Sequence, residues 1–299
     1  MFSFTKEQEI IDISGIKIGG QPGQIPTVLF AGFFFKGEPD YKKAEEDLRK
    51  IYDLSDNLGN KTIPDFFIKK QQNIQPIIEF IEQKVPEESP FSVDIIEPGL
   101  KIQTLQSLRD AGLLKRTIYN SIHIGTTPEE QQALRQNAPE AIIVVAFNPK
   151  DKSPDGKLEV LENSAHLLDK GLVKIVQEIG IKKILLDTAA MAPGDYSGAS
   201  ISAIPVLKEE FGLPTGCAIH NVVEKSKWLE SYQSARDTVD AASNINIPLF
   251  GGDFAIFGPV KNAGTVFPII AWEDILVSEY TDKYFGIKPV EYHPRRKLL

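Results

Sequence analysis

The sequence predicts a closed (β/α)₈ TIM barrel with a short N-terminal β-hairpin that caps one end of it. About eight short apolar runs alternate with longer segments of helical periodicity. The centres of these runs are continuously apolar, as in Ile142-Ile143-Val144-Val145, which is typical of parallel strands covered on both faces. No Gly-x-Gly-x-x-Gly turn follows the first run, so the barrel is favoured over an open dinucleotide-binding sheet.

The expected elements follow one another in a regular order. Segment 16–23 joins a two-residue alternation to a Gly/Pro turn, which predicts the hairpin. Strands are expected at residues 27–35, 62–68, 91–95, 117–120, 141–147, 183–187, 215–219 and 247–254. Helices are expected at residues 41–58, 74–83, 102–111, 127–136, 163–179 and 201–211. Three of these helices end before a glycine suited to a C-cap, namely Gly112, Gly180 and Gly212.

Composition narrows the classes of protein that the chain can belong to. Its 299 residues, 42% of them hydrophobic, suffice for one large core, and no low-complexity linker divides them, so a single domain is expected over residues 1–299. No stretch approaches the roughly 20 apolar residues of a membrane span and no signal sequence opens the chain, so a cytoplasmic location is expected. The net charge of −8 argues against nucleic acid as a partner.

Four polar residues stand at the ends of predicted strands, where the reacting groups of such barrels lie. Asp94, Asn120 and Asp187 close the third, fourth and sixth runs, and Asn221 follows the seventh. Each residue taken singly is explained equally well as a helix cap or a turn former. Together they would converge on one mouth of the barrel, which predicts a binding site there.

The residue types in this set indicate the kind of ligand. Two carboxylates and two neutral amides without a basic cluster suit a molecule that is rich in N–H donors and poor in negative charge. The 2-amino group and ring N–H of a pterin form a flat donor edge, and a carboxylate can accept two parallel hydrogen bonds from it. An amide can donate to the ring carbonyl or accept from another ring N–H. The set therefore favours a reduced pterin as ligand.

The segments that carry these residues resemble the pterin-binding corrinoid methyltransferases. They are Val93-Asp94, Tyr119-Asn120-Ser121, Leu186-Asp187 and His220-Asn221. The opening segments 2–8 and 18–23 are similar to the H subunit of tetrahydromethanopterin S-methyltransferase in particular, and the likeness covers most of the chain. Bacterial relatives of that protein, which pass a methyl group from a corrinoid protein to tetrahydrofolate in glycine-betaine demethylation, give the nearest match.

The resemblance implies an activity and a role for each residue. A methyl group would move between the cobalt of a methyl-corrinoid and N5 of tetrahydrofolate, in a homodimeric enzyme. Asp94, Asn120 and Asp187 would hold the pterin, while Asn221 would bind it and act at N5 as the catalytic residue. A neutral amide can accept from N5–H or donate to the bare nitrogen, so Asn221 would serve both states of N5 without becoming charged.

Residue types that the sequence lacks point to a corrinoid supplied from outside the chain. No Asp-x-His-x-x-Gly string is present, so the corrinoid is expected on a separate partner protein. The four histidines are scattered and Cys217 is the single cysteine, so no protein-bound metal and no disulfide is expected, and Cys217 is interpreted as a core thiol.

Other interpretations fit parts of the sequence. Dihydropteroate synthase shares the barrel, but its Lys and Arg-His positions near the seventh and eighth strands are here uncharged or acidic. A Schiff-base aldolase needs a lysine inside the barrel, whereas Lys182 and Lys183 only precede the sixth strand. A non-catalytic component that docks a corrinoid protein, and an enzyme specific for tetrahydromethanopterin, remain open alternatives.

Overall fold

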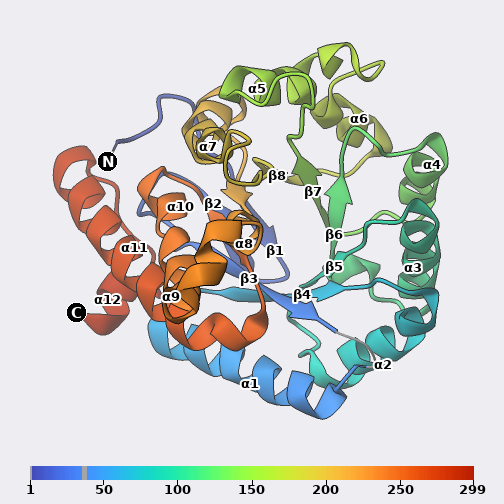
Figure 1. Ribbon diagram of the computed structural model, residues 1–299, viewed down its shortest axis with the longest axis horizontal. Helices are drawn as coiled ribbons and strands as arrows, with labels where there is room; N and C mark the ends of the chain where they lie inside the picture. Colours follow the sequence, from blue (N-terminus) through green and yellow to red (C-terminus); the bar gives the residue numbers. More distant parts are fainter. Residues whose placement is uncertain (1, 36–38) are drawn as a thin grey trace.

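The computed structural model describes residues 2–35 and 39–299, and its main feature there is a closed barrel of eight parallel strands (Figure 1). The barrel strands are β3 (Val28–Phe34), β4 (Thr62–Phe67), β5 (Phe91–Asp94), β6 (Thr117–Ile122), β7 (Ala141–Val145), β8 (Lys183–Asp187), β9 (Thr215–Cys217) and β10 (Phe254–Phe257). They pair in chain order, and β10 closes the ring against β3. The predicted fold class is confirmed.

Helices surround the barrel, and most of them cover the outer face of its strands (Figure 1). They are α1 (Tyr41–Leu58), α2 (Ile74–Lys84), α3 (Pro98–Asp110), α4 (Pro128–Gln136), α5 (Pro154–Glu162), α6 (Leu172–Ile179), α7 (Ser197–Phe211), α8 (His220–Glu224), α9 (Gln233–Ser243), α10 (Asn246–Leu249), α11 (Ala263–Phe285) and α12 (Pro294–Leu298). Short 3₁₀ helices lie at η1 (Gln71–Asn73), η2 (Leu114–Arg116), η3 (Ser164–His166), η4 (Lys227–Tyr232) and η5 (Val260–Asn262). Within the described ranges, no helix combines the length and the apolar character that a membrane crossing needs.

Local sequence explains where several helices begin and end. The Asp40 carboxylate accepts a hydrogen bond from the backbone N–H of Lys43 and caps α1, and the hydroxyls of Thr127 and Ser153 cap α4 and α5 in the same way. Gly180 follows α6 in the left-handed conformation, with φ 99°, as the sequence predicts for a C-cap glycine.

The N-terminal hairpin closes the bottom of the barrel. Its strands β1 (Ile10–Ile13) and β2 (Ile16–Gly19) pair antiparallel. Ile11, Ile13 and Ile18 pack with the side chains that fill the barrel interior, among them Phe30 and Phe254. Full burial of an isoleucine stabilises a fold by about 1.5–3 kcal/mol, so the hairpin contributes substantially to the core. The predicted cap is confirmed, although its first strand begins before the expected segment.

The same interior cluster identifies which residues of each strand point inward. Ile63 of β4, Ile118 of β6 and Leu185 of β8 belong to it. Because side chains alternate along a strand, every second residue toward the C-terminal end also points inward. By this alternation and the pairing register, the upper interior positions are Phe34, Asp65, Phe67, Asp94, Asn120 and Asp187.

Two predicted elements are wrong in their extent. The apolar run at 247–254 is not a strand, because residues 246–249 form α10 and the eighth strand occupies Phe254–Phe257. A short apolar run cannot by itself separate a buried helical turn from a buried strand. The helix expected at 163–179 is interrupted, because α6 begins only at Leu172 and the preceding turn carries Ala165 at φ 53°.

Candidate active site

The C-terminal mouth of the barrel holds three carboxylates, on β4, β5 and β8. Phe67 of β4 pairs in register with Asp94 of β5, and Asp94 pairs with Asn120 of β6. Asp65 lies two residues before Phe67 on the same inward face. Asp65 and Asp187 both repel the charge of Asp94, which places the three carboxylates within electrostatic reach of one another. A site rich in hydrogen-bond acceptors results.

Asn120 is oriented by a neighbour that the sequence analysis did not single out. Its side-chain Nδ2 lies 3.4 Å from one carboxylate oxygen of Asp65 and 3.5 Å from the other. Asp65 is 2% exposed and Asn120 is 8% exposed. Because the amide N–H₂ group donates downward to Asp65, the carbonyl oxygen of Asn120 is the group left for a ligand.

Desolvation at the mouth favours the protonated form of these carboxyls. Burial raises the pKa of Asp65 to about 6, against hydrogen bonding from Ser92 and Asn120, which lowers it. Desolvation, with repulsion from Asp65, holds the pKa of Asp94 well above its ordinary value. Burial raises the pKa of Asp187 to about 6, although a backbone N–H from Ala189 stabilises the ionised form. Clustered groups with shifted pKa values in a concave site are a mark of function.

Two buried lysines stand behind the carboxylates. Lys101 of α3 is 1% exposed, and its ammonium group donates to the backbone carbonyl of Ser121 at 2.7 Å. Ser121 directly follows Asn120 in the chain. Lys157 of α5 is equally buried and donates to the carbonyl of Ala189 at 3.3 Å, two residues after Asp187. Each lysine thus fixes the chain at the end of a strand that carries a predicted site residue.

The lysines also compensate negative charge at the mouth. The charge of Lys101 lowers the pKa of Asp94, and the charge of Lys157 lowers the pKa of Asp187, in both cases against the larger effect of desolvation. Lys101 is paired in turn with the buried Glu130 at 3.0 Å, to which the hydroxyl of Tyr119 donates at 2.7 Å. Two cations therefore balance part of the charge of the three carboxylates.

Asn221 lies in the first turn of α8, the short helix that follows β9. β9 is next to β8, and Gly216 pairs in register with Asp187, so Asn221 is carried toward the same mouth. Among the described residues, its partly exposed side-chain amide makes no hydrogen bond, and it remains available to a ligand. The preceding His220 is held by its Nδ1, which lies 2.9 Å from the carbonyl oxygen of Ile256.

The structure brings Asp94, Asn120 and Asp187 to one mouth of the barrel and places Asn221 in α8, the helix that follows the strand next to Asp187. Sequence reasoning missed Asp65, although a charged residue inside the apolar run Thr62–Phe67 was a usable signal. Cys217 is fully buried, as expected of a core thiol. In the part of the chain that the structure describes, no group of three or more His, Cys, Asp or Glu side chains is arranged to hold a metal ion.

Comparison with known proteins finds one matching family and several similar relatives. Residues 6–290 match the family described as "Tetrahydromethanopterin S-methyltransferase MtrH subunit". The chain is 36% identical to the H subunit of tetrahydromethanopterin S-methyltransferase from Methanothermobacter thermautotrophicus over 313 residues, which covers 100% of both chains. It is 35% identical to the H subunit of the mtx methyltransferase from Methanosarcina mazei over 314 residues, again with 100% of both chains covered.

Solved structures with a similar fold include dihydropteroate synthases. The enzyme from Coxiella burnetii in complex with pteroic acid superposes with a TM-score of 0.58 at 13% identity, over 83% of this chain and 93% of that one. The Yersinia pestis enzyme in complex with a sulfonamide drug gives a TM-score of 0.62 at 12% identity, over 88% of this chain and 97% of that one. At these identities the likeness concerns the fold alone.

Proposed function

The chain belongs to the MtrH family of tetrahydromethanopterin S-methyltransferase, and from this membership and the geometry of the barrel mouth we propose that it transfers a methyl group between a corrinoid protein and N5 of a reduced pterin. The observation that carries the proposal is the convergence of Asp94, Asn120 and Asp187, with Asp65 beneath them, on one mouth. Acceptor groups of this kind match the donor edge of a pterin.

The ring is held by hydrogen bonds to the ionised form of the carboxylates. In the proposed complex, Asp94 and Asp187 accept from the N–H groups of the pyrimidine half of the ring. Asn120, whose amide N–H₂ group is turned toward Asp65, offers its carbonyl oxygen to a further ring N–H. The buried Lys101 and Lys157 offset the cost of three carboxylates in one small space.

Asn221 acts at the nitrogen that exchanges the methyl group. The corrinoid, supplied on a separate protein, brings the methyl group to this mouth as an electrophile. The lone pair of N5 forms the new N–C bond, the electron pair of the broken Co–C bond stays with cobalt, and the N5–H proton must leave. The amide oxygen of Asn221 accepts a hydrogen bond from N5–H as positive charge develops there, which stabilises the transition state more than the bound ring. In the reverse direction its N–H₂ group donates to N5.

Three further features are proposed: the pterin that accepts the methyl group, the oligomeric state and the cellular compartment. We place tetrahydrofolate first as the acceptor, with methyltetrahydrofolate as the product of demethylation of a methylated amine, and tetrahydromethanopterin second. We also propose a homodimer that works in the cytoplasm. The overall resemblance of the chain to bacterial relatives of the H subunit that pass a methyl group to tetrahydrofolate motivates this choice.

An anaerobic spectrophotometric assay tests the reaction directly. The purified chain is mixed with methylcobalamin, or with a cognate methyl-corrinoid protein, and with tetrahydrofolate or tetrahydromethanopterin, and cob(I)alamin formation is followed. Growth of the cob(I)alamin signal with tetrahydrofolate supports the full proposal. Growth of the signal only with tetrahydromethanopterin would make that pterin the acceptor in place of tetrahydrofolate. No signal with either acceptor, together with measurable pterin binding, would establish a non-catalytic docking role instead.

A further inference from the structure

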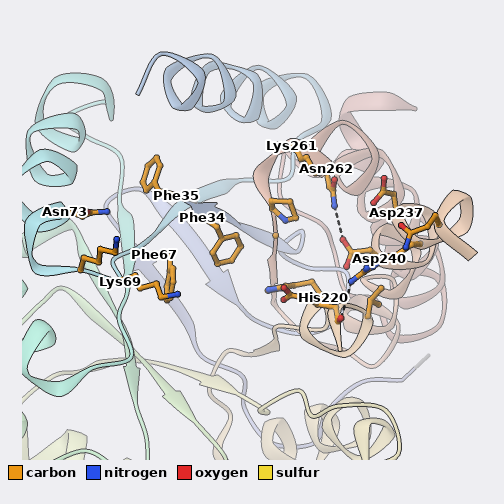
Figure 2. Close-up of a pocket in the computed structure, with 17 residues that line it drawn as sticks. Phe34, Phe35, Phe67, Lys69, Asn73, His220, Asp237, Asp240, Lys261 and Asn262 are labelled. Atoms are coloured by element: carbon orange, nitrogen blue, oxygen red, sulfur yellow. Dashed lines mark hydrogen bonds between the residues drawn. The ribbon is translucent and has the colours of Figure 1, made fainter. Parts of the chain in front are cut away.

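A pocket of ≈ 940 Å³ opens at the barrel mouth beside the carboxylates (Figure 2). Its described lining residues come from the ends of β3, β4 and β10, from η1 and η5, and from helices α8 and α9. Asp65, Asp94, Asn120 and Asp187 are not among them, so the ring site described above leaves this space unused.

The pocket is continuous with the ring site along one row of paired residues. Phe34 pairs in register with Phe67, and Phe67 pairs with Asp94. The rings of Phe34 and Phe67 lie 5.8 Å apart and form an aromatic floor that begins next to the Asp94 carboxylate. A ligand bound to Asp94 is therefore one strand spacing, about 5 Å, away from an aromatic surface.

A second connection runs through α8. His220 lines the pocket and directly precedes Asn221, which is proposed to face N5 (Figure 2). In any pterin the side chain is attached at C6, the carbon bonded to N5. A group on C6 consequently leaves the ring on the side of Asn221 and His220. Burial lowers the pKa of His220, and with Nδ1 donating to the Ile256 carbonyl, its Nε2 is a hydrogen-bond acceptor.

The two walls of the pocket carry different charges. Lys69 and Lys70 are exposed at the end of β4, and neither forms an ion pair with another described residue. The facing wall holds Asp237 and Asp240 of α9, and Asp240 accepts a hydrogen bond from Asn262 at 3.1 Å (Figure 2). Arg236 of α9 and Lys261 of η5 also line the pocket, so the α9 side is mixed in charge. Among the described lining residues, those that follow β4 include two lysines and no acidic residue, and an anionic group is attracted to that wall.

We propose that this pocket binds the side chain of the reduced pterin, an aromatic amine followed by a chain with acidic groups. The proposal rests on the methyl-transfer function proposed above and adds a second recognition site to it. The aromatic amine ring stacks on Phe34 and Phe67, its bridging N–H donates to Nε2 of His220, and the acidic groups pair with Lys69 and Lys70. The folate and methanopterin side chains share this chemistry.

Anaerobic calorimetric titration of the full chain tests the pocket assignment separately from the proposed pterin-ring site and methyl transfer. Three probes are used: 6-methyltetrahydropterin, which has no side chain beyond a methyl group, tetrahydrofolate and tetrahydromethanopterin. Each is titrated into the wild type and into the Lys69→Gln/Lys70→Gln variant. The matched control is Lys115→Gln/Lys182→Gln, which removes two exposed lysines at the opposite end of the barrel.

We expect the Lys69→Gln/Lys70→Gln variant to bind the acidic pterins about tenfold more weakly and 6-methyltetrahydropterin within about twofold of the wild type, since exposed ion pairs contribute modestly. The control variant is expected to match the wild type. Whichever acidic pterin shows the loss is the one whose side chain the pocket takes. An equal effect on all three probes, or none, overturns the pocket assignment and leaves the ring site standing. Failure of the wild type to bind any of the probes overturns both.

Discussion

The amide group of Asn120 donates toward the carboxylate of Asp65, at 3.4 and 3.5 Å, beneath the mouth of the barrel. Both side chains are almost fully buried, so neither can exchange this contact for water. Asp65 consequently orients Asn120, whose carbonyl oxygen is left free of this contact, and the charge of Asp65 acts on the adjacent Asp94.

The first prediction concerns the electrostatic coupling of these carboxyls. Desolvation and then repulsion from Asp65 hold the pKa of Asp94 high, so Asp65→Asn is expected to lower the pKa of Asp94 toward its ordinary value. A ¹³C NMR titration of labelled aspartate carboxyls measures it. The matched variant Asp187→Asn should lower the pKa less, because Asp187 contributes less to the shift. An unchanged Asp94 titration in Asp65→Asn would contradict the proposed coupling.

The second prediction is a pH dependence of pterin binding. Burial raises the pKa of Asp187 to about 6, and the donor edge of the ring pairs with the ionised carboxylate. Binding must therefore displace a proton below that pH, and affinity is expected to rise at least about tenfold between pH 5 and pH 7. Anaerobic titrations across this range measure the profile. Asp187→Asn should reduce the rise, and a wild-type affinity that falls with pH would refute the assigned role.

The raised pKa of Asp187 also predicts a pH dependence of the stability of the ligand-free protein. A carboxyl whose folded-state pKa is raised contributes stability that is fully present below its unfolded-state pKa, near 4, and that is lost as pH rises through about 6. Between pH 4 and pH 7, the unfolding free energy of the wild type should fall by up to about 3 kcal/mol more than that of Asp187→Asn. Chemical unfolding at the two pH values measures the difference, and parallel losses in both proteins would argue against the shift.

The third prediction separates catalysis from binding at Asn221. Asn221→Ala is expected to lower kcat about a hundredfold while pterin Kd changes less than about threefold, because the hydrogen bond strengthens only as charge develops on N5. Single-turnover methyl transfer and calorimetric titration give the two quantities. Val222→Ala, one residue further along α8, serves as the control and should retain the wild-type rate. A loss of affinity as large as the loss of rate would make Asn221 a binding residue only.

The fourth prediction concerns the buried lysine behind Asn120. Lys101→Met leaves the fully buried Glu130 without its cation and is expected to destabilise the fold by about 3–5 kcal/mol. The double variant Lys101→Met/Glu130→Gln removes both charges and should recover more than half of that loss. Equilibrium chemical unfolding compares the two variants. Equal stability of the single and double variants would show that the ion pair itself is not what the single substitution disrupts.

The barrel and three of the four clustered residues were accessible from the sequence because strand-end positions share one mouth whatever the details of packing. Asp94, Asn120 and Asp187 each close an apolar run, and that position alone brings them together. Asp65 lies inside its strand, so its charge within an apolar run marks it as unusual, but only the packing of the core shows that its side chain points into the barrel. Lys101 and Lys157 come from helices, and their approach to the carbonyls of Ser121 and Ala189 depends on helix packing that no local pattern encodes.

The row that joins Asn120, Asp94, Phe67 and Phe34 has an evolutionary consequence. The residues proposed to hold the ring stand on β5, β6 and β8, whereas the neighbouring pocket is lined mainly from the ends of β3, β4 and β10 and from α8 and α9. The exposed Lys69 and Lys70 and the half-buried Phe34 and Phe67 lie outside the buried charge network of Lys101, Glu130 and Lys157, so they can be exchanged without removing any of its members. In the proposed enzyme, a change of one-carbon carrier would therefore need only a few substitutions at the rim, and the residues proposed for methyl transfer would stay the same.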